Sequence, residues 1–159
     1  MQRNGYTLVE IAIVLVVIGM ILAAGLPAFG NFRSDLQRQQ AREQVVQSVR
    51  SARQAAVTRH IPVIMTFGNG AATTDVTYYR THVDNNNDGV WQSGELRWQK
   101  TMPKGTRLSL VSLTPTDLLK YDISGILIPG TTGGFVVIAG SGTKRDTLYL
   151  AQTGMAYRQ

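Results

Sequence analysis

The sequence lacks the residues on which most enzyme chemistry depends. Among its 159 residues there is no cysteine, and there are only two histidines and five prolines. Without cysteine the chain can form no disulfide, no thiolate nucleophile and no zinc–thiolate centre. The two histidines, His60 and His82, stand in no recognisable nucleophile or zinc pattern, and no phosphate-binding glycine motif is present. We therefore expect a protein that is not an enzyme and has no catalytic residue.

Charge is almost absent from the first part of the chain. After a short polar start, residues 1–5, an apolar run extends from Tyr6 to Phe29 with Glu10 as its only charged residue. About 20 apolar residues cross a bilayer, so residues 6–29 are predicted to be a transmembrane helix. Arg3 favours a cytoplasmic N-terminus. A cleaved signal peptide is the alternative, but no small-residue cleavage site follows the apolar core.

Glu10 is the feature that a plain membrane anchor does not explain. A carboxylate inside a membrane-length helix is costly, and such residues are usually paired with an opposite charge. A second subunit can supply that charge. The position of Glu10 therefore indicates a protein that assembles with other chains.

The remaining residues, 30–159, are long enough for one compact domain. No glycine or proline occurs between Asn31 and His60, and apolar residues recur there at helical spacing. We predict one helix from Tyr6 to about His60, whose second half packs on a sheet. The apolar positions of that second half are Val45, Val46, Val49, Ala52 and Ala56.

Short β-forming segments alternate with glycine-containing turns after His60. One long helix followed by such segments predicts an α+β fold. The order of the strands does not follow from the sequence. The candidate strands are residues 61–67, 74–82, 96–100, 107–113, 125–128, 134–139 and 147–152.

The start of the chain, GYTLVE before an apolar helix, resembles the class III leader of type IV prepilins and type II secretion pseudopilins. The resemblance implies that a prepilin peptidase removes residues 1–5 by cleaving between Gly5 and Tyr6. Tyr6 then becomes the N-methylated first residue, where the family usually has phenylalanine. Glu10 matches the family glutamate, which implies pairing with the N-terminal amine of a neighbouring subunit.

A narrower resemblance covers the helix and the first strand. The segment QQAREQVVQSVRSARQAAVTRHIPVIMTF is similar to the GspH/FimT group of minor pilins and pseudopilins, in which a helix bearing an Ala-Arg pair runs straight into a strand. This resemblance implies the pilin fold, in which a long N-terminal helix, transmembrane in its first half, packs on an antiparallel β-sheet domain. It implies a structural subunit of a type IV pilus or a type II secretion pseudopilus, acting at the tip or in priming.

The same resemblance implies partners and a location. The partners are other pilin or pseudopilin subunits, the prepilin peptidase, the inner-membrane assembly machinery and the lipid bilayer. The chain would cross the inner membrane once, with a cytoplasmic N-terminus and a periplasmic domain at residues 30–159, and would then enter the filament.

An acidic loop, DNNNDGVWQSGE, follows the second candidate strand. It fits the calcium-loop pattern D-x-[DN]-x-[DN]-G-x5-E at every specified position. The alternative is an Asn/Asp/Gly turn that folds without metal. No cofactor is required by the fold, and Ca²⁺ is the one ion that the pattern predicts. Its expected ligands are Asp84, Asn86, Asp88, the Val90 carbonyl and Glu95.

The formal net charge of +6 suggests an acidic partner such as nucleic acid. FimT-type pilins that bind DNA for uptake have a C-terminal Gly-Arg-x-Arg motif, but this chain has Gly154-Met155-Ala156-Tyr157, without either arginine. Because of the positive net charge, DNA binding in natural transformation is the alternative function, although the motif itself is absent. It would use phosphate contacts and base stacking from Lys144, Arg145, Tyr157 and Arg158.

Overall fold

One long helix and eight strands make up the structure, a computed structural model that describes residues 6–68, 74–114, 118–128, 132–140, 144–151 and 153–158. The side chains of residues 24–29, 110, 114, 132, 133, 135 and 158 are outside the description. The elements in chain order are α1 (Leu8–Arg59), β1 (Val63–Phe67), β2 (Tyr78–Val83), β3 (Arg97–Thr101), β4 (Arg107–Thr114), β5 (Leu118–Tyr121), β6 (Thr132–Ala139), β7 (Arg145–Leu150) and β8 (Ala156–Arg158).

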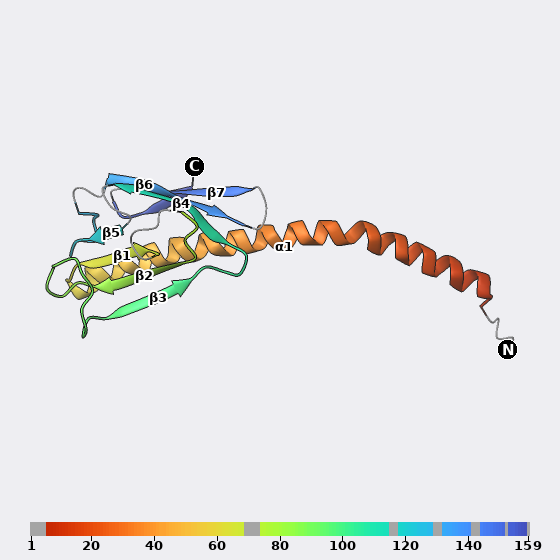
Figure 1. Cartoon of the computed structure of the whole chain (residues 1–159), viewed down its shortest axis with the longest axis horizontal. Helices are drawn as coiled ribbons and strands as arrows, with labels where there is room; N and C mark the ends of the chain where they lie inside the picture. The colour runs from red at the N-terminus through yellow and green to blue at the C-terminus, as the bar shows by residue number, and fades with distance from the viewer. Residues whose placement is uncertain are drawn as a thin grey trace.

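Helix α1 confirms the single long helix that the sequence predicts. It begins after Thr7, continues through Pro27 and ends at Arg59, where His60 adopts the left-handed conformation with φ 54° and ψ 36°. The left-handed residue turns the chain directly into β1, as a helix C-cap does. Figure 1 shows that the N-terminal half of α1 projects away from the domain, while the C-terminal half lies against the strands.

The prediction that residues 6–29 span a membrane is not confirmed by the structure. Among the residues described, no helix is both long enough and apolar enough to qualify as a membrane span. The predicted leader, residues 1–5, lies outside the described residues.

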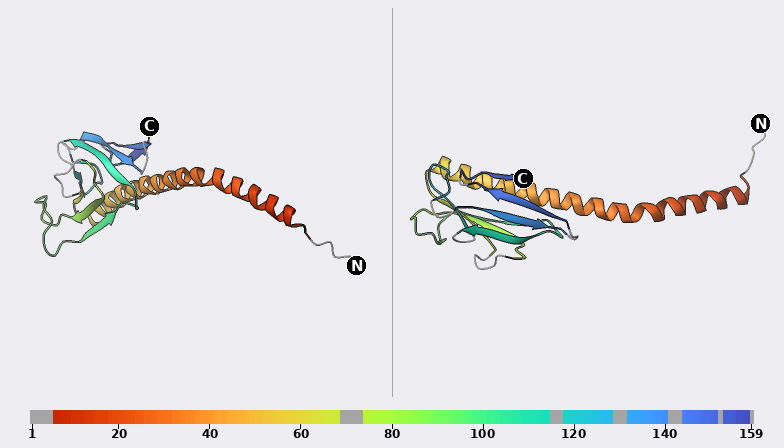
Figure 2. Two further views of the ribbon diagram at one scale, coloured as in Figure 1. Left: turned by 45° about the vertical axis from the view of Figure 1, so that its right-hand side comes forward. Right: turned by 90° about the horizontal axis from the view of Figure 1, so that it is seen from above.

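The strands form two four-stranded antiparallel sheets. The first has the order β3-β2-β1-β5 and the second has the order β4-β6-β7-β8. In the first sheet β1 is central, with Val63 opposite Val83 of β2 on one side and Tyr121 of β5 on the other. Figure 2 shows both sheets beside the C-terminal half of α1. The α+β fold is confirmed.

The core lies between α1 and the sheets. The apolar stripe predicted for the second half of the helix is buried, since Val45, Val49, Ala52 and Ala56 are 0% exposed. Small residues at these positions allow the helix to lie close to the strands. Opposite them lie large buried side chains of both sheets, among them Met65, Phe67, Tyr79, Leu108, Tyr121, Ile138 and Leu148.

Two features of the strand pattern differ from the prediction. Residues 125–128 do not form a strand, because the Asp122 carboxylate accepts hydrogen bonds from Ser124 and Ile126 N–H and closes a turn. The strand of this region is β5, which the sequence analysis missed, and only Leu127 returns to bridge Tyr121. The short C-terminal strand β8 was also missed.

Candidate functional site

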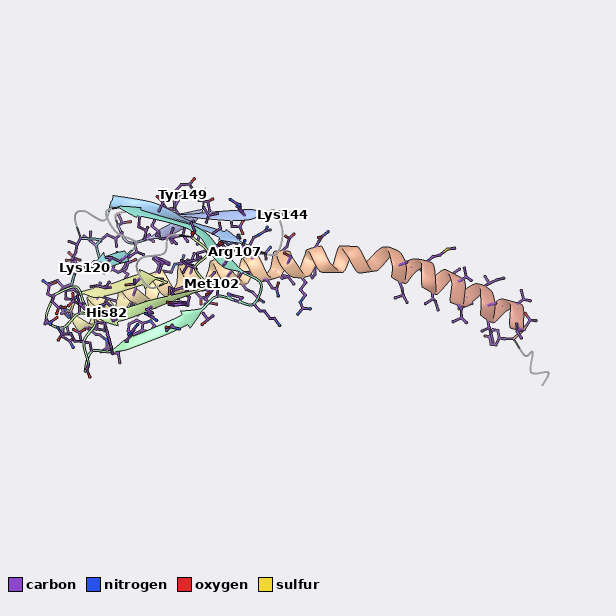
Figure 3. The ribbon with its side chains drawn as sticks, viewed as in Figure 1. His82, Met102, Arg107, Lys120, Lys144 and Tyr149 are labelled. Atoms are coloured by element: carbon purple, nitrogen blue, oxygen red, sulfur yellow. The ribbon has the colours of Figure 1, made fainter. Side chains whose placement is uncertain are left out.

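The N-terminal half of α1 exposes nearly all of its apolar side chains. Leu8 is 84% exposed and Leu22 is 61% exposed, although residues of this type usually lie in a core. Figure 3 shows these side chains radiating from a helix with no strand beside it. A contiguous apolar surface of this size marks an interface with another protein or with lipid. We call this surface, which is formed by the exposed apolar side chains of residues 6–23 and by Phe32, the N-terminal apolar face.

Glu10 is the only charged residue in the N-terminal apolar face. Its Oε2 accepts hydrogen bonds from the Thr7 backbone N–H at 2.9 Å and from the Thr7 hydroxyl at 3.1 Å. The Glu10 N–H donates in return to Thr7 Oγ1 at 3.3 Å. This is a complete capping box, in which the carboxylate satisfies the first turn of its own helix.

The capping box fixes the direction of the Glu10 side chain. Oε2 is engaged by Thr7, and within the described chain no hydrogen bond involves Oε1. The side chain lies beside Tyr6, Ile11 and Val14 in a shallow apolar recess. Thr7 is a residue that the sequence analysis missed, although the Thr-x-x-Glu spacing at the start of an apolar run is a sequence signal for this motif.

The acidic loop, residues 84–95, is held by its own backbone. Glu95 Oε1 accepts from Asn85 N–H at 2.7 Å, and Glu95 Oε2 accepts from Gln92 N–H at 3.0 Å. Asp88 Oδ1 accepts from Val90 N–H at 2.8 Å, and this bond lowers the pKa of the Asp88 carboxyl. Asn86 Oδ1 accepts from Asp88 N–H at 3.3 Å. The carboxylates thus stabilise the turn directly, as in Asx motifs.

Asp84, the first residue of this loop, is fully buried. Its Oδ2 accepts from Gly89 N–H at 3.0 Å and lies 3.1 Å from Lys120 Nζ on β5. Figure 3 shows Lys120 and His82 at the end of the domain far from the N-terminus. In the described part of the chain, no group of three His, Cys, Asp or Glu residues is placed to hold a metal ion. The calcium site therefore stays a prediction from the sequence.

His82 lies next to this loop and is 6% exposed. Burial lowers the pKa of the imidazole, against the opposing effect of Glu95 and Asp84. A lowered pKa keeps the ring neutral near pH 7. The charged groups that act on the ring are Glu95, Asp84, Arg97 and Asp88.

The four residues predicted to contact DNA are only partly brought together. Lys144 Nζ lies 3.0 Å from Asp35 Oδ2 on α1, so its charge is largely neutralised. Arg145 is exposed at the start of β7, and Tyr157 is 51% exposed on β8 with its ring stacked on Tyr149 at 5.8 Å. The side chain of Arg158 is outside the described set. DNA binding stays a prediction.

Comparison with known families decides the assignment. Residues 41–154 match the family described as type II transport protein GspH, and residues 1–26 match the prokaryotic N-terminal methylation motif. The GspH match covers more than half of the chain. The chain belongs to the GspH family. No curated protein matches the sequence significantly.

Solved structures agree with the fold of the GspH family. The type IV minor pilin FimU of Pseudomonas aeruginosa is similar with a TM-score of 0.53 at 16% identity, over 80% of this chain and 92% of FimU. The minor pseudopilin EpsH from the type 2 secretion system of Vibrio cholerae is similar with a TM-score of 0.50 at 14% identity, over 79% of this chain and 95% of EpsH. At these identities the likeness concerns the fold.

Family membership defines what this GspH protein is. It is a pseudopilin of the type II secretion class, a structural and non-enzymatic protein. Membership implies processing by a prepilin peptidase and assembly with other pseudopilins. The methylation motif implies an inner-membrane prepilin that is assembled into a pseudopilus.

Proposed function

We propose that this GspH protein enters the pseudopilus through the N-terminal apolar face, with Glu10 pairing with the N-terminal amine of a neighbouring subunit. The observation that supports this proposal is the contrast between the exposed apolar side chains of the helix, 46–85% exposed between Tyr6 and Leu22, and its single carboxylate. Packing such helices together removes the apolar surface from water or lipid, and the amine offsets the buried charge.

The capping box gives Glu10 a defined geometry for that contact. Thr7 and Glu10 both follow the predicted cleavage site, so the motif persists after the leader is removed and Tyr6 is methylated. With Oε2 held by Thr7, Oε1 accepts the hydrogen bond from the neighbouring ammonium. Charge-assisted bonds of this kind are about twice as strong as neutral ones. We further propose a place at the tip or in priming, which rests on the sequence resemblance alone.

The test is Glu10→Gln in the full chain, compared with Asp75→Asn, which removes the charge of an exposed carboxylate of the domain outside the helix. We expect Glu10→Gln and Glu10→Ala to insert in the membrane normally but to be lost from sheared pseudopili, while Asp75→Asn is incorporated like the wild type. Breaking a buried ion pair costs about 3–5 kcal/mol, enough to block a contact repeated along a filament. Normal incorporation of either Glu10 variant would overturn the proposal.

DNA binding remains the second candidate, because Arg145 and Tyr157 are exposed on neighbouring strands. Titration of a single-stranded oligonucleotide against the full chain and its Arg145→Glu variant tests this candidate: binding at low salt that Arg145→Glu weakens would support it, and no binding would rule it out.

A further inference from the structure

A groove runs along the outer side of α1 where the helix meets β8 and the turn before it. Its first part is lined by Arg42, Glu43, Val46, Arg50, Leu148, Ala156 and Tyr157. Its second part is lined by Arg50, Arg53, Gln54, Val57, Gly154 and Met155. Arg50 lines both parts, so they lie next to each other along α1, and we call the two together the α1–β8 groove.

The length of the groove defines what it can hold. The helix side extends from Arg42 to Val57, which at 1.5 Å per residue is about 22 Å. An extended peptide rises about 3.3 Å per residue, so about seven residues span that length. The groove is therefore matched to a short extended segment.

The lining combines apolar contacts with positive charge. Val46 and Leu148 form a buried apolar floor, while Val57 and Met155 are 43% and 50% exposed. The lining includes three arginines, Arg42, Arg50 and Arg53, but only one carboxylate. That carboxylate, Glu43, forms an ion pair with Arg42 at 3.3 Å.

Arg50 is the arginine of the groove whose side chain can bind a ligand. Arg53 Nε donates to the Gly125 carbonyl at 3.0 Å, so its guanidinium is fixed to the domain. Arg50 is exposed, and within the described residues no hydrogen bond or ion pair involves its side chain. An exposed arginine beside an apolar floor can bind a ligand whose apolar side chains contact the floor and whose carboxylate pairs with the guanidinium.

We propose that the α1–β8 groove binds an extended acidic segment of another protein subunit, with alternating apolar and carboxylate side chains. The apolar side chains contact Val46, Val57 and Met155, and a carboxylate pairs with Arg50. Nucleic acid fits less well, because one face of the Tyr157 ring is covered by Tyr149 and the floor is apolar. The proposal that this partner is a pseudopilin rests on the proposed function.

The test uses the full chain in a mild non-ionic detergent and two synthetic peptides that alternate leucine with glutamate or with glutamine. Binding is followed by fluorescence anisotropy of the labelled peptide. We expect the glutamate peptide to bind more tightly than the glutamine peptide. We expect Arg50→Glu to weaken the glutamate peptide at least about fivefold, since the change removes one attraction and adds one repulsion.

The matched control is Arg145→Glu, which makes the same charge change at an exposed arginine outside the groove. An equal loss in both variants, or no binding of the glutamate peptide, would overturn the proposal. Met155→Ser should also weaken binding without changing charge, and an unchanged affinity of this variant would contradict the proposed apolar contact with Met155.

A single-stranded oligonucleotide is titrated in parallel. If it binds more tightly than the peptide and loses affinity in Arg50→Glu, the groove is a nucleic-acid site and the proposal is wrong. The titration needs no filament, so its result is independent of whether Glu10→Ala blocks incorporation.

Discussion

The two halves of α1 differ both in apolar content, which is much higher in the N-terminal half, and in the elements that cover them. In the C-terminal half, Val49 is 0% exposed because both sheets of the same chain cover it. In the N-terminal half, Val14 is 54% exposed and no other element of the described chain lies beside it. One helix therefore serves two purposes, because intrachain burial stabilises the domain while the uncovered half remains available for other subunits or lipid.

The carboxylates of the two regions differ in the same way. Asp84 in the domain is buried and has a cation, Lys120, within the same chain. Glu10 in the N-terminal apolar face has, among the described residues, only the neutral donors of Thr7. The domain thus pairs its buried charge internally, whereas Glu10 has no cation beside it in that part of the chain, which is the condition for the contact that we propose with a neighbouring amine.

The largest expected difference between the two halves of α1 comes from placing a charge at one valine in each half. Val49→Asp should lower the free energy of unfolding of the domain by at least about 4 kcal/mol, because an unpaired carboxylate replaces a core side chain. Val14→Asp should leave the domain unchanged, since its site is exposed, but should abolish incorporation into pseudopili. Urea denaturation in detergent, followed by domain tryptophan fluorescence, measures the first effect, and sheared-filament immunoblots measure the second. Equal destabilisation by both variants would show that the halves are not independent.

The N-terminal region could be predicted from the sequence because its signals are local. Glu10, the apolar run and the stripe at Val45, Val49 and Ala52 follow from spacing along one helix. The Thr7 capping box is an equally local signal, since Glu10 lies only three positions after Thr7, although the sequence analysis did not include it.

The domain was less predictable because its decisive contacts join distant residues. Strand β5 pairs Tyr121 with Val63, and Lys144 pairs with Asp35 across 109 positions. No local pattern specifies such pairs. Strand β8 has only three residues, too few for an alternating pattern, and its place in the second sheet depends on β7 beside it.

A backbone position in the domain offers a more moderate test. Gly154 has φ +75°, and a Cβ there would lie 2.7 Å from Tyr121 Cε1. Gly154→Ala should therefore cost about 1–3 kcal/mol of domain stability through strain and overpacking. Gly89→Ala is the matched control, since Gly89 has φ +83° with no atom within 4 Å of the added Cβ. A larger loss for Gly154→Ala in urea denaturation isolates the contacts of the added Cβ with Tyr121 and with the Gly125 carbonyl, which would lie 2.9 Å from it.

Calcium addition can show whether Lys120 already serves as the cation that neutralises Asp84 in the acidic loop. With Lys120 Nζ 3.1 Å from Asp84, calcium should change the melting temperature of the wild type only slightly. Lys120→Gln removes the ammonium, leaves Asp84 buried without a cation, and should make the melting temperature rise with calcium. Asp84→Asn in addition should abolish that rise. If calcium raises the wild-type melting temperature and Asp84→Asn alone removes the effect, the loop is the calcium site that the sequence pattern predicts.

The smallest expected effect lies at the boundary between the two halves of α1. Lys144 at the start of β7 contacts Asp35, and its hydrogen bond lowers the pKa of the Asp35 carboxyl. The pKa of Asp35 is lower in the folded chain than in the unfolded chain, where it is about 3.9. The contact therefore stabilises the domain fully above the unfolded pKa, and this stabilisation is lost as the pH falls through the lower, folded pKa. Lys144→Ala should therefore lower the urea midpoint slightly at neutral pH, and the difference from wild type should shrink in acid. Arg145→Ala, whose side chain has no ion-pair partner among the described residues, should leave the pH profile unchanged. If the urea midpoint of Lys144→Ala followed the same pH dependence as that of the wild type down to acid pH, the contact with Asp35 would not stabilise the domain. The covered half of α1 would then begin after Asp35, closer to Ala41.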